Sequence, residues 1–337
     1  MKKILAIICI LILASAFFAG CTENEKETLK VYHAGSLSIP FDEMKKKFEE
    51  EHPDVEVRNE GAGSVATIRK VTDQGKKPDV VAVADYTLIP DMMYDGDKAD
   101  WTVRFAKNRM VMAYTEHSNY NDEIDTDNWY DVLDRTDVKY GFSNPNDDPC
   151  GYRSQMVTLL AESHYGDDTI FERLTEDHTG ITAEGNNISV PSSLDGTIDT
   201  SEVMIRSAEV DLMGALEAGE IDYLYIYQSV AEQHEGVEYI QLPEAIDLSS
   251  VEYAENYGKV TLTRGSGDKS VGKPIVYGIT IPSTVSEKEL AVEYVKMLID
   301  ETGQDILTNK GQPSIVPAKT DNMQEVPSQL KELVEED

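Results

Sequence analysis

Hydrophobic residues near the start of the chain follow first the period of a strand and then that of a helix. Phe41, Met44 and Phe48 recur at helical spacing, and Pro40 is acceptable in a first helical turn. A second helix is expected over residues 65–73. Three segments have the alternating or continuous apolar character of strands, namely 29–33, 55–58 and 78–84. The resulting βαβαβ order predicts a parallel sheet that is buried on both faces.

From residue 108 onward, a second series of strands and helices is expected. Its predicted strands are 108–115, 138–143, 203–206, 221–227, 237–241, 260–263 and 275–281, and its predicted helices are 149–163, one ending at 216, 286–300 and 303–308. Gly219 suits the position just after a helix. The last strand and the last helices should return to the first unit. The pattern therefore predicts two α/β lobes joined by crossing strands, with a hinge and a ligand cleft between them.

The first residues have the order of an export signal. Lys2 and Lys3 precede an apolar run over 4–20, which is shorter than a membrane span and is followed by Cys21 and a polar stretch. The residues FAG before Cys21 resemble a lipobox, so we expect Cys21 to carry a lipid after cleavage. The alternative is plain cleavage near Ala19, with Cys21 as an ordinary thiol.

These features give an expected division of the chain. The signal peptide is 1–20, the lipid-anchored tether is 21–28, the first lobe is 29–112 with 270–337, and the second lobe is 113–269. Such a length is right for two domains that each bury a core.

Charge and cysteine content limit the partners and the kind of fold. The net charge of −33 argues against nucleic acid and anionic membrane surfaces as partners. Cys9 would leave with the signal and Cys21 would be the anchor, so Cys150 has no partner for an intramolecular disulfide. The fold must therefore rest on its hydrophobic core.

Two Gly-Ser sequences stand between a predicted strand and a predicted helix. Ser36 lies in HAGSL and Ser64 lies in EGAGSV. Both strand ends should lie at one edge of a parallel sheet, so both serines should face one crevice. Glycine allows close backbone approach, and helix N-termini supply free N–H groups. Either serine alone could be a turn or cap residue, but their repetition predicts an oxyanion site built without Lys or Arg.

The second lobe offers a candidate sequence at 146–154 (NDDPCGYRS). Asp148 with Pro149 is explained fully as an N-cap followed by proline at the first helical position. Cys150 is expected to be an inert packing residue, because no neighbour in the sequence would stabilise its thiolate. Arg153 is expected to pair with one of the many acids.

Further along, one acidic residue and three tyrosines are candidates. Glu209 is expected in the first turn of a helix, where the helix dipole favours an acid even without a ligand. Tyr223, Tyr225 and Tyr227 share one face of a predicted strand and should mostly be packing residues, least clearly so Tyr227 at the strand's end.

Five motifs in order resemble the archaeal-type tungstate/molybdate-binding proteins of ABC importers. They are HAGSL, EGAGSVATIRK, PDVVAVADY, DPCGYRS, and EVDL followed by LEAGEIDYLYIYQSVAEQH. The resemblance covers about residues 29–317. It implies a two-lobed, type II periplasmic-binding-protein-like fold, α/β in class, with mixed sheets flanked by helices and a cleft at the hinge.

The resemblance also implies a ligand set. Ser36 and Ser64 would hydrogen-bond a tungstate or molybdate oxyanion, and Tyr227 would assist. Asp148 and Glu209 would approach the tungsten or molybdenum centre itself, which can accept carboxylate oxygen where the sulfur of sulfate cannot.

One departure from the family pattern leaves the second carboxylate open. Ser207 and Ala208 stand where the family usually has proline and lysine, after the insertion-like segment 193–201. The register could therefore slip, which would make Asp211 the contact in place of Glu209.

The expected protein is a monomeric, lipid-anchored binding protein on the extracellular face of the cell membrane. It has no cofactor and delivers its anion to the membrane subunits of an ABC importer. A ferric iron site, or a site for sulfate or phosphate, is the alternative ligand class. An enzyme would need Cys150 as nucleophile with His33 or His234 as base, and no local signature supports that pairing.

Overall fold

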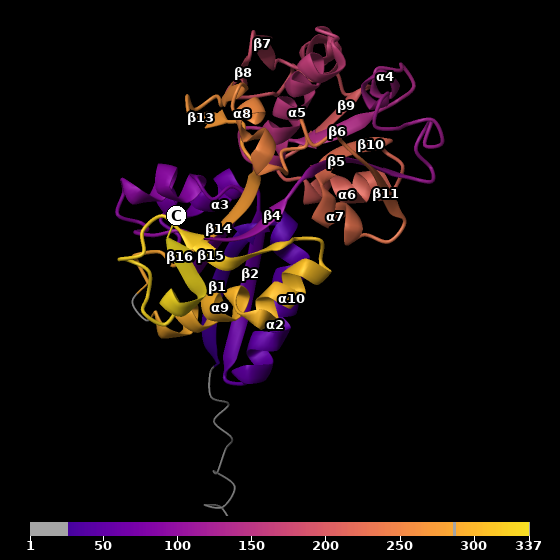
Figure 1. Cartoon of the computed structure of the whole chain (residues 1–337). Coiled ribbons are helices and arrows are strands. Elements are labelled where there is room, and N and C mark those ends of the chain that lie inside the picture. Colours follow the sequence, from indigo (N-terminus) through magenta and orange to yellow (C-terminus); the bar gives the residue numbers. More distant parts are fainter. Residues whose placement is uncertain (1–25, 286–287, 337) are drawn as a thin grey trace, which may run out of the picture.

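A computed structural model describes residues 26–285 and 288–336 of the chain (Figure 1). The expected signal peptide and Cys21 lie outside the described residues. Figure 1 shows two lobes, one formed by the two ends of the described chain and one formed by its middle. No helix among the described residues is long and apolar enough to cross a membrane.

A seven-stranded mixed sheet is the centre of the first lobe, in the order β16-β15-β4-β14-β3-β1-β2. The strands are β1 (Glu27–Ala34), β2 (Val55–Ala62), β3 (Val80–Val83), β4 (Val103–Asn108), β14 (Ile275–Thr280), β15 (Ser314–Thr320) and β16 (Val334–Glu336). Strand β1 pairs in parallel with both β2 and β3, which confirms the predicted βαβαβ unit. The returning strand β14 is antiparallel to β3 and β4.

Helices of the first lobe bury the apolar residues that predicted them. They are α2 (Ser38–Glu51), α3 (Ser64–Thr72), α9 (Glu289–Ile299) and α10 (Glu301–Asn309). Phe41, Met44 and Phe48 are fully buried on α2, as the helical spacing requires. Burying a side chain of this size contributes about 1.5–3 kcal/mol.

The second lobe contains a five-stranded sheet, β11-β5-β10-β6-β9, and a four-stranded sheet, β13-β12-β8-β7. The first consists of β5 (Met110–Thr115), β6 (Tyr140–Ser143), β9 (Val203–Arg206), β10 (Tyr223–Tyr227) and β11 (Val237–Gln241). The second consists of β7 (Thr182–Glu184), β8 (Asn187–Ser189), β12 (Thr261–Thr263) and β13 (Lys269–Val271). Strands β9 and β11 have the bounds that the sequence predicted.

Helices of the second lobe include α4 (Trp129–Leu133), α5 (Pro149–Tyr165), α6 (Val210–Glu217), α7 (Gln228–Glu232) and α8 (Ala254–Tyr257). Helix α5 contacts β5, β6, β10 and β12, and its residues from Pro149 to Ala161 are all buried. Any polar side chain on this helix must therefore find its partners inside the protein.

Two parts of the architecture differ from the sequence prediction. The strand expected over 108–115 corresponds to β5, whereas the preceding strand β4 was not predicted; the two strands belong to different sheets and are separated by Arg109. Strands β7, β8, β13 and β16 were not predicted, because three-residue strands are too short to show a periodic pattern. The seven-residue strand β15 was also not predicted. Gly219 has the expected left-handed conformation after α6, with φ of 69°.

The chain passes between the lobes at two places. It leaves the seven-stranded sheet between Asn108 and Met110 and returns to it between Val271 and Ile275. Both crossings lie within a few residues of the expected lobe boundaries, which stay predictions. The two crossings give the molecule the form of two lobes connected by a hinge (Figure 1).

Candidate functional site

Two Gly-Ser loops leave the same edge of the first sheet, as the sequence predicted. Ser36 lies in a 3₁₀ turn (Gly35–Leu37) that follows β1, and Ser64 is the first residue of α3, which follows β2. The two strands run in parallel with Ala34 opposite Ala62. Both serine side chains are buried, so their hydroxyl groups are shielded from bulk water.

Each serine hydroxyl accepts a hydrogen bond from another part of the first lobe. The Tyr277 hydroxyl donates to Ser36 Oγ at 3.1 Å, and the backbone N–H of Ala84 donates to Ser64 Oγ at 3.0 Å. A hydroxyl that accepts in this way keeps its own hydrogen for another acceptor. The two serines are thus positioned donors, which is the arrangement that an oxyanion requires.

Close approach of the lobes explains the glycine in each loop. A Cβ atom at Gly63 would lie 2.5 Å from the Asp147 carbonyl oxygen and 3.0 Å from Asp148 Cβ. A Cβ atom at Gly35 would lie 2.9 Å from Val210 Cγ2 and 3.5 Å from Glu209 Oε1. The first loop therefore lies against Glu209, and the second lies against Asp148.

The N-terminus of α3 also holds the second lobe directly. The backbone N–H groups of Val65 and Ala66 donate to the Asp147 carbonyl oxygen at 3.1 and 3.2 Å. These bonds use N–H groups that a helix cannot satisfy internally. The structure is consequently a closed arrangement of the two lobes.

Asp148 caps helix α5, as the sequence predicted. Its Oδ1 accepts from the backbone N–H of Cys150 at 3.3 Å, and its Oδ2 accepts from the backbone N–H of Glu209 at 3.0 Å. Because one carboxylate joins the starts of α5 and α6, Asp148 fixes where Glu209 lies.

Glu209 lies one residue before α6 and is buried, whereas Asp211 is exposed. The buried carboxylate beside Asp148 and the Gly35 loop is thus that of Glu209. Among the described residues, neither Glu209 carboxylate oxygen has a hydrogen-bond partner of ordinary geometry. A buried ionised carboxylate without such partners is costly.

The pKa of the Glu209 carboxyl is raised well above its ordinary value. Burial is the larger cause, and the negative charge of Asp148 adds to it, while the Ser36 hydroxyl acts in the opposite direction. Two acidic groups held together in a buried place disfavour ionisation of one of them. A positively charged centre between them would remove this penalty.

Tyr227 ends strand β10 and is fully buried. Its hydroxyl accepts a hydrogen bond from Arg153 Nη1 at 2.8 Å, and the same nitrogen donates to the Ala84 carbonyl oxygen at 2.8 Å. Arg153 has an acidic partner, as expected. That partner is Asp85 of the first lobe, with Nη2 and Oδ2 3.5 Å apart. The buried guanidinium group of Arg153 therefore hydrogen-bonds the predicted ligand Tyr227. The sequence did not indicate this contact.

Sequence reasoning also missed the residues that support the two loops. Tyr277 contacts Ser36 from β14, Gln312 Nε2 donates to the Ser36 carbonyl oxygen at 2.9 Å, and Asn108 Nδ2 donates to the Tyr277 hydroxyl at 2.8 Å. These residues are far from the Gly-Ser motifs along the chain. No local pattern could have connected them.

The residues that an enzyme would need, Cys150 with His33 or His234, each contact a different group. Cys150 is buried with Sγ 3.7 Å from the Tyr225 carbonyl oxygen, and burial raises the pKa of its thiol well above the ordinary value. His33 Nδ1 lies 2.8 Å from the Ala34 carbonyl oxygen, and His234 Nδ1 lies 2.8 Å from Glu217 Oε1. This geometry offers no activated nucleophile. Within the described ranges, no group of three or more His, Cys, Asp and Glu could hold a metal ion.

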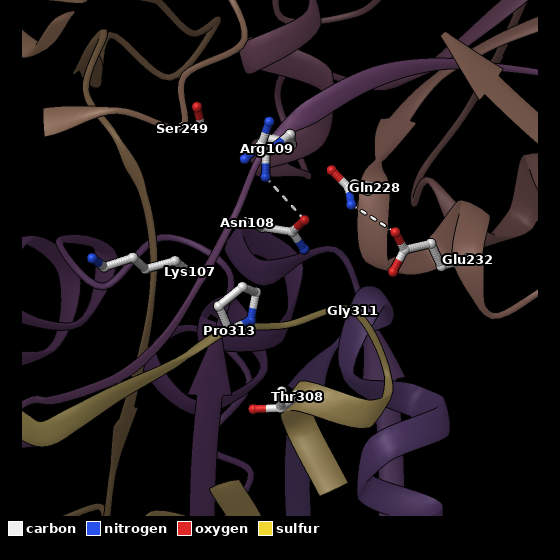
Figure 2. A pocket seen from close by; sticks show the side chains of 9 residues that line it. All are labelled: Lys107, Asn108, Arg109, Gln228, Glu232, Ser249, Thr308, Gly311 and Pro313. Atoms are coloured by element: carbon white, nitrogen blue, oxygen red, sulfur yellow. Dashed lines mark hydrogen bonds between the residues drawn. The ribbon is translucent and has the colours of Figure 1, made fainter. Parts of the chain in front are cut away.

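A pocket of about 310 Å³ lies beside the hinge (Figure 2). Its lining comes from both lobes and includes Asn108, Arg109, Gln228 and Gly311. None of the five predicted ligand residues lines it. In the closed arrangement, the predicted ligand residues are buried between the lobes instead.

Residues 29–312 match the family described as bacterial extracellular solute-binding protein, and the chain belongs to this family. Its role is therefore the binding and transport of a solute. A solute-binding protein of Methanoculleus marisnigri is 46% identical, and the match covers 99% of both chains. The molybdate/tungstate-binding protein WtpA of Pyrococcus abyssi is 43% identical over 99% of this chain and 98% of its own. The resemblance inferred from the five motifs is confirmed.

Solved structures confirm the predicted type of fold. The periplasmic molybdate-binding protein of Azotobacter vinelandii has a TM-score of 0.57 at 14% identity, covering 84% of this chain and 98% of that chain. The sulfate-binding protein SubI of Mycobacterium tuberculosis has a TM-score of 0.59 at 13% identity, covering 91% of this chain and 89% of that chain. At such low identity, the likeness concerns the fold alone.

Gly63→Ala should hinder closure of the lobes more than it affects folding. The new Cβ would meet backbone atoms of Asp147 across the lobe junction, and these atoms cannot rotate away. We expect weaker oxyanion binding in calorimetry, with a melting temperature close to that of the wild type. Gly214→Ala is the control, since a Cβ at Gly214 meets nothing within 4 Å. Equal binding by the Gly63 and Gly214 variants would contradict the prediction.

Glu209→Gln should stabilise the ligand-free protein in a pH-dependent way. Because the folded-state pKa of Glu209 is raised, wild-type stability falls as pH rises above the ordinary carboxyl pKa, whereas glutamine does not titrate. At neutral pH the gain should be about 1–3 kcal/mol, the cost of one unsatisfied buried polar group. It should shrink toward pH 4.

Urea unfolding of the wild type and the Glu209→Gln variant at several pH values measures this difference. Glu220→Gln, which changes an exposed carboxylate of the same lobe, is the control. A gain that is equal at pH 4 and pH 8 would show that ionisation of Glu209 is not the cause.

Proposed function

We propose that this protein captures molybdate or tungstate outside the cell and delivers it to the membrane subunits of an ABC importer. The observation that carries the proposal is the position of Glu209. Its buried carboxylate has no hydrogen-bond partner of ordinary geometry among the described residues and lies between Asp148 and the Gly35-Ser36 loop. Such a group needs a positively charged partner in the bound state.

The two kinds of ligand group suit two parts of one anion. The hydroxyl groups of Ser36 and Ser64 would donate to the outer oxygen atoms, and Tyr227 would assist them. Asp148 and Glu209 would approach the molybdenum or tungsten centre, which carries the positive charge and accepts further oxygen ligands. The sulfur of sulfate accepts none, so the same carboxylates would repel sulfate.

Relatives support this choice of solute. The WtpA proteins of Pyrococcus abyssi and Thermococcus kodakarensis, both molybdate/tungstate-binding proteins by name, are 43% and 42% identical to this chain over 99% of its length. Identity at this level over the whole length favours a shared site. The closed lobes and the hinge suit a mechanism in which closure sequesters the anion before transfer.

The family and the signal-like first residues support a place of action at the extracellular face of the membrane. A monomer held at the extracellular face of the membrane through a lipid on Cys21 would stay close to its importer.

Other solutes are less well supported. Ferric iron would need a set of anionic oxygen ligands, but the two Gly-Ser loops present hydrogen-bond donors, which repel a cation. Sulfate and phosphate would suit the donors but not the two carboxylates. Sulfate and phosphate are therefore the anions to compare with molybdate and tungstate in binding experiments.

Molybdate and tungstate should raise the melting temperature of the purified domain in a dose-dependent way. A ligand present at 100 times its Kd stabilises the folded state by about 2.7 kcal/mol, which corresponds to a rise of about 4 °C for a chain of this size. Sulfate and phosphate should give much smaller shifts at the same concentration. Absence of a shift with both metal oxyanions would overturn the proposed function.

Asp148→Asn should reduce tungstate affinity more strongly than any residual sulfate affinity. Asparagine is as good an N-cap as aspartate, so helix α5 should keep its start while the carboxylate contact is lost. Asp300→Asn is a matched control, since Asp300 caps α10 with Oδ1 2.9 Å from the Thr302 nitrogen. Calorimetric titrations with both anions measure the difference. Equal losses of affinity for tungstate and sulfate would show that Asp148 acts only as the N-cap of α5.

A further inference from the structure

A buried cluster of charged groups connects the two lobes beside the candidate site. Asp85 follows β3 in the first lobe, and its side chain is 2% exposed. Three side chains from other parts of the chain contact its carboxylate group. Arg153 Nη2 lies 3.5 Å from Oδ2, the Tyr152 hydroxyl donates to Oδ2 at 2.6 Å, and Lys273 Nζ lies 3.0 Å from Oδ1.

These partners come from both sides of the hinge. Arg153 and Tyr152 lie on α5, which packs on the five-stranded sheet of the second lobe. Lys273 lies in the segment that crosses back to the first lobe between β13 and β14. Asp85 therefore joins the second lobe and the crossing segment to the end of β3.

Arg153 links the same cluster to two predicted ligand residues. Nη1 donates both to the Tyr227 hydroxyl and to the Ala84 carbonyl oxygen. The N–H of Ala84 in turn donates to Ser64 Oγ. The guanidinium thus holds Tyr227 in the second lobe in a fixed relation to Ser64 in the first.

The ion pair between Asp85 and Arg153 joins residues of different lobes, so it forms only while the lobes are closed. Burial would raise the pKa of the Asp85 carboxyl, but the charges of Lys273 and Arg153 hold it well below its ordinary range. Arg153 is 2% exposed, and Asp85 is its only ion-pair partner among the described residues. A buried cation that loses its partner must be rehydrated, so breaking such a pair is costly.

We propose that Asp85 and Arg153 form an interlobe latch that positions Tyr227 and sets the rate at which the bound oxyanion is released. The inference rests on the proposed function for its ligand. Opening of the hinge would separate Arg153 from both Asp85 and the Ala84 carbonyl group. The latch therefore opposes opening while it leaves the approach of the anion to the open form unaffected.

Asp85→Asn tests the latch with little change of shape. We expect the rate constant for molybdate release to rise about tenfold, with the association rate constant within about twofold of the wild type, because the contact with Arg153 joins the two lobes and is made only on closure. Stopped-flow tryptophan fluorescence at increasing molybdate concentrations gives the association rate constant. Together with the Kd from calorimetry, it gives the rate constant for release.

Arg153→Lys is the second variant, since lysine keeps the charge but cannot hold Tyr227, Ala84 and Asp85 at once. It should release molybdate faster in the same way. If Arg153 acts through Tyr227, adding Tyr227→Phe to Arg153→Lys should cost less than the sum of the two single changes. Arg173→Lys is the matched control, because Arg173 pairs with Asp134 and Asp167 within the second lobe.

Small-angle X-ray scattering separates failure of the latch from failure of the proposed function. If the wild type binds neither molybdate nor tungstate, the proposed function fails, and the latch still predicts a larger radius of gyration for ligand-free Asp85→Asn than for the wild type. Folded Asp85→Asn and Arg153→Lys proteins with wild-type release rates and wild-type radii would overturn the latch. An equal effect of Arg173→Lys would also overturn it.

Discussion

The structure depends on the burial of two carboxylates between two lobes. Asp148 satisfies its oxygen atoms with backbone N–H groups at the starts of α5 and α6, and in doing so it holds Glu209 where it has no such partner among the described residues. An unsatisfied buried carboxylate destabilises the protein that carries it. The unsatisfied carboxylate of Glu209 lies where a bound anion with an electropositive centre would remove this destabilisation. The free protein is therefore less stable than it could be, and the protein would prefer ligands that have such a centre.

Burial of these groups requires close contact between loops of different lobes. Gly35 and Gly63 allow that contact because a Cβ at either position would meet atoms of the opposite lobe. The same two loops present Ser36 and Ser64, whose hydroxyl groups are oriented by Tyr277 and by the backbone of Ala84. Donor loops and carboxylates are thus parts of one junction, and neither set would have its present environment in a separate lobe.

The Asp85–Arg153 pair adds an electrostatic attraction between the two lobes. Asp148 and Glu209 both belong to the second lobe, where the Glu209 backbone N–H donates to Asp148. Burial and, second to it, the negative charge of Asp148 raise the pKa of the Glu209 carboxyl. The nearby pair contributes opposite charges that meet only across the same junction. The net charge of the chain, −33, disfavours an incoming anion, so binding must rest on local contacts in the site.

Local patterns in the sequence determined the elements and the two donor loops. The spacing of Phe41, Met44 and Phe48 predicted α2, and the βαβαβ order placed both Gly-Ser sequences at one sheet edge, since parallel strands end on the same side. Only the tertiary structure decided that Glu209, and not Asp211, is buried beside Asp148, and that Arg153 reaches Asp85. These contacts join residues about 60 to 70 positions apart, and the packing of whole lobes, which no local period records, brings them together.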